Sequence, residues 1–341
     1  MAVDLASRIR KMEPRRLPSP TEPSREHAMW KSLQKHLRHD SATLRGFAAW
    51  GATRLPHWWL RASPGPIALL VGLTRAPTRA QLLANHRFVQ GHRAALVEAL
   101  DVAATLANYG HCLAEGLAGS GPNPPPFRYT VEGRENLEMA RDRNRGAILV
   151  TIHAGSWDVA GAVMKNRGFE LGIAMAKERD DRAREISDAA RQQAGVKVFH
   201  VGEDPLSVLP LAQHVRHGGA VALQVDRVPA GMRSRAVPFF GRRYRVPLGP
   251  FQLAQVTGAP IIPVFTARLG FADHLVRADT EVTLPRRANP GELDRAMTSV
   301  MAAAERFVRR FPDQWFNFAE LPIDESTTTL GGEESSVAKV G

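Results

Sequence analysis

The sequence predicts an α/β protein with a mostly parallel central sheet flanked by helices, preceded by a helical N-terminal region. From about residue 127, short apolar runs rich in β-branched residues alternate with helical stretches, as in sheets built with crossover helices. The run 147–152 is apolar apart from Thr151 and rich in β-branched residues, which is typical of an interior strand buried on both faces. Before residue 120, apolar residues such as Leu96, Leu100 and Leu106 recur at three- and four-residue steps, which indicates amphipathic helices.

The N-terminal part is expected to be a tail followed by helices. Residues 1–25 are polar and hold Pro18, Pro20 and Pro23, so a mobile tail is predicted there. The helical region is expected over 26–120, with a basic helix at 25–39 and two helices over 78–116. The Gly- and Pro-rich stretch 116–126 predicts the boundary to an α/β domain at 121–322. The polar residues 323–341 are expected to be a disordered tail.

Strands and helices are then expected in alternation. The stretch 227–245 is expected to be a loop. Strands are expected at 127–131, 147–152, 171–176, 196–201, 220–225, 260–267 and 276–283, and helices at 132–143, 157–164, 180–193, 206–217, 251–257 and 294–311.

The overall charge favours an anionic partner. Lys and Arg number 45 against 34 Asp and Glu, a net charge of +11, which suits a lipid headgroup surface, a phosphorylated substrate, an acidic carrier protein or nucleic acid. Nucleic acid is disfavoured because the sequence contains no helix-turn-helix, zinc module or RNA-binding aromatic signature. The single cysteine, Cys112, excludes an internal disulfide and a cysteine metal cluster, and its apolar neighbours predict a core position. No metal site is predicted.

No run approaches the ~18 apolar residues of a membrane span. The protein is therefore expected to be cytoplasmic, with a peripheral contact on the inner membrane face left open. Trp58 and Trp59 lie beside Arg54 and Arg61, a composition that suits either an interfacial membrane contact or a tryptophan-rich helical core.

The candidate catalytic motif follows the strand predicted at 147–152. His153 comes where that strand ends, and Gly155 and Ser156 supply a flexible joint and a good helix N-cap. Asp158 would then lie in the first helical turn. Open α/β sheets place their active sites at the carboxyl ends of strands, so these residues predict a His–Asp pair in which Asp158 fixes the tautomer of His153. The alternative is a buried histidine beside a helix-capping aspartate.

A second candidate site lies in 227–245, RVPAGMRSRAVPFFGRRYR. It holds six arginines, and no acidic residue occurs between Asp226 and Asp273. Guanidinium groups match phosphate, and the apolar insert adds a hydrophobic element, so the stretch suits a substrate with an anionic head and a hydrocarbon tail. The alternative is a solvated basic loop. The expected substrate-binding residues are Arg227, Phe239, Phe240, Arg242, Arg243 and Arg245, together with Gly155, Ser156 and Trp157.

Four co-linear elements over about residues 80–320 carry a family resemblance. They are IHAGSWD, VPFFGRRYRVPLGP, LAQVTGAPIIPV and the Pro-Asp-Gln-Trp at 312–315. The chain resembles the lysophospholipid acyltransferase-like superfamily, and within it the lipid A lauroyl/myristoyl acyltransferases and the phosphatidylinositol mannoside acyltransferases. The resemblance implies an H-x-x-x-x-D catalytic motif at His153 and Asp158, and an FFG segment at Phe239, Phe240 and Gly241.

The resemblance implies an O- or N-acyltransferase. His153 would deprotonate an acceptor hydroxyl or amine, which attacks the thioester of acyl-CoA or an acylated carrier protein as co-substrate, with no other cofactor. Backbone N–H groups at 155–157 or an arginine of 227–245 would stabilise the oxyanion. A non-catalytic lipid- or carrier-binding protein of the same fold and a thioester hydrolase remain as alternatives. The acceptor and the acyl-chain length stay open.

Overall fold

The computed structural model describes residues 42–325 apart from short gaps at 120, 144, 157–160, 162, 166–167, 177–187, 189–191, 193–194, 202–204 and 230. Four expected segments lie wholly or mostly outside the described residues: the tail at 1–25, the basic helix at 25–39, the helix at 180–193 and the tail at 323–341, of which only 323–325 are described. Trp157 and Asp158 also lie outside the described residues.

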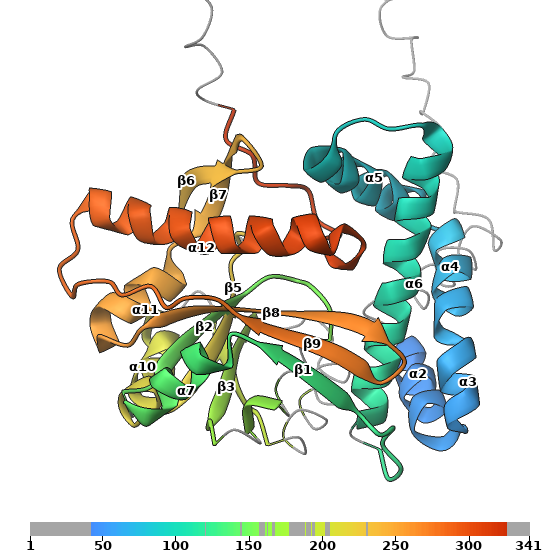
Figure 1. The fold of residues 1–341 in the computed structure, drawn as a ribbon, viewed down its shortest axis with the longest axis horizontal. Coiled ribbons are helices and arrows are strands. Elements are labelled where there is room, and N and C mark those ends of the chain that lie inside the picture. Colours follow the sequence, from blue (N-terminus) through green and yellow to red (C-terminus); the bar gives the residue numbers. More distant parts are fainter. Residues whose placement is uncertain are drawn as a thin grey trace, which may run out of the picture.

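The mostly parallel sheet is confirmed (Figure 1). Of the six described pairs of neighbouring strands, five run parallel and one, β8 with β9, runs antiparallel. The strands of this sheet lie in the order β1 (Arg128–Glu132), β9 (Asp273–Ala278), β8 (Ile261–Gly270), β2 (Ala147–Thr151), β5 (Ala220–Gln224), β3 (Leu171–Ala176) and β4 (Lys197–Val201).

The central strand β2 is buried on both faces because helices cover both. Alternate residues of a strand point to opposite faces. Ile148 and Val150 therefore join one core cluster, with residues of α10 (Leu209–Arg216), α11 (Gly249–Thr257) and α12 (Pro290–Arg310). Ala147 and Leu149 join the other, with Leu137 of α7 (Arg134–Asp142). This two-sided burial explains the unbroken apolar run in the sequence.

The expectation of a loop over 227–245 was wrong. Most of that stretch forms an antiparallel hairpin of β6 (Ser234–Phe239) and β7 (Arg242–Pro247), which packs on α12 (Figure 1). The turn places Phe240 and Gly241 at φ 49° and 73°, the left-handed region that a two-residue hairpin turn requires. Charged residues on the exposed face hid the strand alternation of the sequence. The strand expected at 276–283 also begins earlier, at Asp273.

From residue 42, where the described part of the N-terminal region begins, the chain forms α2 (Ala42–Arg54), α3 (His57–Ala62), α4 (Pro64–Leu73), α5 (Ala76–Gln90) and α6 (Ala95–Gly119). Helix α6 lies between α4 and the sheet (Figure 1). It is joined to β8 by a buried ion pair, in which Nε of Arg268 lies 2.9 Å from Oε1 of the fully buried Glu115. The buried Cys112 of α6 confirms the prediction of a core cysteine.

The C-terminal segment contacts the hairpin beyond residue 322. Ile323 forms a bridge with Tyr244 of β7, and the main-chain N–H of Asp324 donates to the carbonyl of Arg243. The C-terminal segment therefore continues across the hairpin for at least two more residues.

Candidate active site

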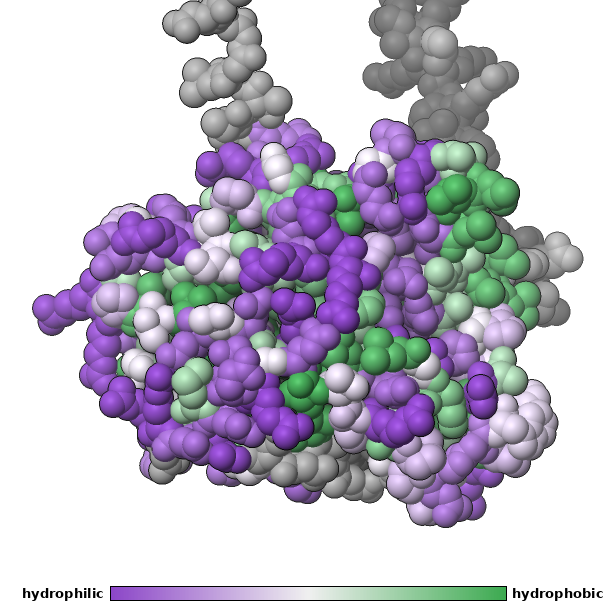
Figure 2. Space-filling model, in the orientation of Figure 1, coloured by the Kyte–Doolittle hydropathy of each residue, from purple (hydrophilic) through white to green (hydrophobic). Residues whose placement is uncertain are grey.

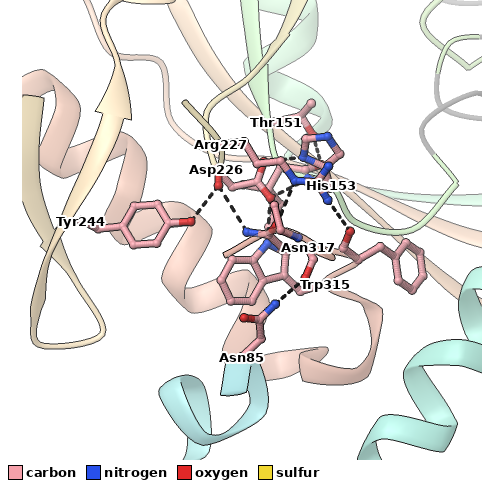
Figure 3. A network of polar contacts seen from close by, with 11 residues as sticks. Asn85, Thr151, His153, Asp226, Arg227, Tyr244, Trp315 and Asn317 are labelled. Carbon is pink, nitrogen blue, oxygen red and sulfur yellow. Dashed lines mark hydrogen bonds and ion pairs between the residues drawn. The ribbon is translucent and has the colours of Figure 1, made fainter. Parts of the chain in front are cut away.

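His153 and Asp226 meet because they follow two neighbouring parallel strands. Thr151, the last residue of β2, pairs with Gln224, the last residue of β5. His153 and Asp226 each come two residues later, so both lie at the same carboxyl edge of the sheet. Nδ1 of His153 lies 2.7 Å from Oδ1 of Asp226 (Figure 3). Open α/β sheets bind their ligands at this edge.

The carboxylate of Asp226 is fully buried and accepts several hydrogen bonds. Its Oδ2 accepts from the main-chain N–H of His153 at 3.1 Å and from the indole Nε1–H of Trp315 at 2.8 Å. Burial alone would raise the pKa of Asp226, but the charge and hydrogen bond of His153, the charge of Arg227 and the Trp315 hydrogen bond outweigh it and lower this pKa to about 2. Asp226 is therefore ionised at neutral pH.

The ionised carboxylate fixes the tautomer of His153. A carboxylate can only accept hydrogen bonds, so Nδ1 must carry the proton, and in the neutral ring Nε2 carries the lone pair. The side chain of His153 is 25% exposed, and among the described residues none hydrogen-bonds to Nε2. A positioned imidazole with an available lone pair can act as a general base.

A second layer of hydrogen bonds holds Asp226 from three distant parts of the chain (Figure 3). The hydroxyl of Tyr244, on the hairpin, donates to the main-chain carbonyl of Asp226 at 2.7 Å. Arg227 donates from Nε to Oδ1 of Asn317 at 2.9 Å and also to the carbonyl of Phe316 at 2.8 Å. The amide of Asn85, on α5, donates to the carbonyl of Asn317. The guanidinium of Arg227, expected to bind substrate, is thus engaged within the protein.

The turn after β2 is fixed by the C-terminal segment. The N–H of Phe316 donates to the carbonyl of His153 at 2.6 Å, and the N–H of Gly155 donates to the carbonyl of Gln314 at 3.3 Å. One of the expected oxyanion donors, the Gly155 N–H, therefore already has an acceptor. Ser156 is buried, and its hydroxyl donates to the carbonyl of Cys112 at 3.2 Å.

The hairpin separates the other predicted binding residues. Phe239 is fully buried and packs edge-on against Trp315, with ring centroids 5.9 Å apart. The ring of Phe240 is half-buried beneath the guanidinium of Arg309. Arg243 and Arg245 alternate with Tyr244 along β7, so they point away from Asp226. Arg245 pairs with Asp324, and Arg242 is exposed at the hairpin turn.

Asp226 was not predicted as a site residue, and Asp158, the predicted partner of His153, lies outside the described residues. The role of Asp158 stays a prediction. A usable signal for Asp226 existed, because it directly follows the strand expected at 220–225. Residues that follow neighbouring parallel strands meet at one sheet edge. Sequence alone does not give the strand order, and the sequence between β2 and β5 holds two further strands.

Gly155 is expected to be required for the shape of this turn. Its φ is 56°, and a Cβ there would lie 2.2 Å from the carbonyl oxygen of Thr266. Gly91 offers a matched control, because its φ is 74° and a Cβ there would meet nothing within 4 Å. Gly91→Ala should lower the free energy of unfolding by about 1–3 kcal/mol from backbone strain alone, because its φ of 74° with ψ of −176° is a conformation essentially restricted to glycine. Gly155→Ala should cost about 1–3 kcal/mol more because the new methyl group overlaps the backbone of β8. Urea unfolding of the two variants measures the difference, and equal losses would contradict the close approach.

Among the residues that the structure describes, no group of three or more His, Cys, Asp and Glu side chains is arranged to hold a metal ion. The candidate site described above consists of one imidazole, one buried carboxylate and the aromatic and amide residues that hold them.

Comparison with known proteins places this geometry in a family. The family model of bacterial lipid A biosynthesis acyltransferases matches residues 30–321, which is most of the chain. The chain belongs to the lipid A biosynthesis acyltransferase family. The match includes His153, Asp226 and the C-terminal segment around Trp315, so the whole hydrogen-bonded site lies within the family's region.

Two curated relatives of this lipid A acyltransferase family member are named as acyltransferases. The phosphatidylinositol mannoside acyltransferase of Mycolicibacterium smegmatis is 32% identical over 135 residues, covering 38% of this chain and 43% of that protein. The lipid A biosynthesis acyltransferase of Haemophilus influenzae is 23% identical over 189 residues, covering 55% and 57%. The alignments thus span about half the length of these relatives.

A solved structure, the 1-acyl-sn-glycerophosphate acyltransferase PlsC of Thermotoga maritima, aligns with a TM-score of 0.33 at 14% identity. The alignment covers 67% of this chain and 97% of that one.

Proposed function

We propose that the protein is an acyltransferase that moves a fatty acyl group from an acyl-CoA or acyl-carrier-protein thioester to a hydroxyl or amine of a lipid-like or anionic acceptor. The observation that carries the proposal is the buried, ionised Asp226 hydrogen-bonded to Nδ1 of the partly exposed His153. Family membership and the names of the relatives support the reaction type. We further propose that the protein works in the cytoplasm, at a membrane surface.

In the proposed reaction, Nε2 of His153 takes the proton from the acceptor hydroxyl. The oxygen attacks the thioester carbonyl carbon, and the C–O bond forms while negative charge builds on the carbonyl oxygen. The C–S bond then breaks, and the departing sulfur takes the proton from the imidazolium, so that the neutral ring is restored. Asp226 keeps the proton on Nδ1 throughout and stabilises the imidazolium.

Direct transfer of this kind needs no nucleophile from the enzyme, which agrees with the burial of the nearest candidates. Cys112 is buried, and burial raises the pKa of its thiol to about 12. Ser156 is buried and donates its hydroxyl hydrogen to a main-chain carbonyl. The oxyanion donor is proposed to come from the main chain at 156–157, since the Gly155 N–H already has an acceptor.

The proposal is tested by measuring thiol release from a panel of acyl-CoA and acyl-carrier-protein donors, with and without a lipid extract. We expect thiol release only when acceptor is present, together with acylated lipid products detected by mass spectrometry. Release without acceptor would indicate a thioester hydrolase. Binding of donor without any release would indicate a non-catalytic binding protein. Either of these results would overturn the proposal.

A further inference from the structure

Helix α4 presents large apolar side chains to solvent and small ones to the protein. Its sequence, PGPIALLVGL, has no charged residue and no polar side chain. Gly65, Ala68 and Gly72 face α6, where a Cβ on Gly72 would lie 2.5 Å from Cδ1 of Leu106. Leu70 and Leu73 face outward and are 66% and 68% exposed. In water-soluble proteins the opposite arrangement is usual, with large apolar residues inward.

The exposed apolar surface extends beyond α4. On α6, Leu96 and Leu100 lie on the same side of the helix as the residues that contact α4, one to two turns beyond the end of α4. On α3, Trp58 and Trp59 are exposed and pack against each other edge to face. Figure 2 shows hydrophobic surface gathered along the edge of the molecule formed by α4. We call the exposed apolar residues of α3, α4 and the first turns of α6 the α4 face: Trp58, Trp59, Ile67, Leu70, Leu73, Leu96 and Leu100.

The segment that carries α3, α4 and α5 has charge of one sign. From residue 41 to residue 97 the sequence contains seven arginines and no aspartate or glutamate, and the first two acidic residues of α6, Glu98 and Asp101, are paired with Arg87 and Arg93. Arg54 and Arg61, which flank the tryptophans, are exposed, and no ion pair involves either of them among the described residues. An apolar patch of this extent marks an interaction surface. Tryptophan and arginine at its border are typical of the membrane–water interface, where anionic headgroups attract cations.

We propose that the α4 face docks on an anionic phospholipid bilayer, with the apolar side chains inserted among the lipids and Arg54 and Arg61 at the headgroups. The proposal deepens the proposed function, because a lipid-like acceptor would then be met at its own membrane. No helix in the described part of the chain is long and apolar enough to cross a bilayer, so the contact is one of surface docking. A twofold dimer through this face would instead bring the exposed Arg54 and Arg61 of two copies together, at an electrostatic cost.

The same helix links this face to the proposed catalytic site. Tyr109 of α6 packs edge-on against Phe316 and Phe318, with centroids 5.5 and 4.9 Å apart. Phe316 in turn binds the main chain of His153. Asn108 of α6 hydrogen-bonds to Asp313 at 2.8 Å. Docking through α4 would therefore place the His153 turn at a fixed position relative to the membrane.

The test is co-sedimentation of the full chain with phosphatidylcholine vesicles, with and without phosphatidylglycerol. We expect tight, salt-sensitive binding to the anionic vesicles. Leu70→Glu should weaken that binding at least about tenfold, because one buried leucine is lost and an anion is added. Leu209→Glu on α10 is the matched control, since Leu209 is 54% exposed on a helix away from the α4 face, and it should bind as the wild type does. Arg61→Gln should weaken binding to anionic vesicles about fivefold and leave neutral vesicles unaffected.

Three results would overturn the proposal. The first is that the full chain stays in the supernatant with both kinds of vesicle. The second is that Leu70→Glu binds the vesicles as tightly as Leu209→Glu. The third is that Leu70→Glu changes the dimer content on gel filtration, or lowers the free energy of unfolding, without changing vesicle binding. The last outcome would mean that a second copy or another segment of this chain covers the α4 face. Because vesicle binding requires no turnover, it is measured independently of acyl transfer.

Discussion

Replacing His153 by alanine is expected to reduce acyl transfer about 10²–10⁴-fold or more, the usual contribution of a general base. Without the imidazole, no group at this position can take the proton from the acceptor, so kcat should fall while donor binding persists. The assay is single-turnover product formation measured by mass spectrometry. Near-normal turnover in His153→Ala would remove the proposed mechanism.

Two further variants separate catalysis from folding. The alanine variant leaves the buried Asp226 with fewer donors, so some loss of stability is expected as well. His153→Asn keeps an amide that can donate to Asp226 but cannot serve as a base, and it should be as inactive as alanine while unfolding closer to the wild type. His217→Ala, at an exposed histidine after α10, should change neither property. If His217→Ala were as inactive as His153→Ala, the loss would not report on the proposed base.

The sheet could be predicted well because strands that are buried on both faces have continuous apolar sequences. Strand β2 is buried on both faces over its first four residues, which are all apolar, and the alternation with helices follows from parallel pairing. The hairpin was missed for the converse reason. The buried residues of β6 and β7 are Val237, Phe239, Tyr244, Val246 and Pro247, and Arg245 separates Tyr244 from Val246. Because many of the other residues are arginines, the sequence of this stretch resembles that of a charged loop.

The candidate site was predicted in part. The sequence placed His153 at the end of a buried strand, and the structure agrees. It could not place Asp226 beside His153, because the sequence does not show that β5 and β2 are neighbours in the sheet. In the chain, Asp226 comes 73 residues after His153. The C-terminal segment was noted only for its resemblance to a family element. Its function in the structure, in which Trp315 binds the carboxylate and Phe316 binds the His153 carbonyl, depends on tertiary contacts that no local pattern records.

Asp226→Asn is expected to lower kcat about 10²–10⁴-fold, by analogy with the loss of the aspartate in a Ser–His–Asp triad. Asn can present its NH₂ group to Nδ1, which would favour the tautomer with the proton on Nε2 and remove the base. Asp226 acts through His153, so it is a positioning residue. The KM for the acyl donor should change little. Trp315→Phe is the matched control, because it removes one hydrogen bond to Oδ2 but keeps the charge, and it should lose less than about tenfold in kcat.

The pH dependence of stability in Asp226→Asn tests whether the carboxylate is ionised in the folded protein. The pKa of Asp226 is lowered from 3.8 to about 2 on folding, so the ionised carboxylate stabilises the fold fully above pH about 4, and this contribution is lost as the pH falls toward 2. The gap in unfolding free energy between wild type and variant should therefore narrow over that window, as urea titrations at each pH would measure. A gap that does not depend on pH would mean that Asp226 only fills space beneath the histidine.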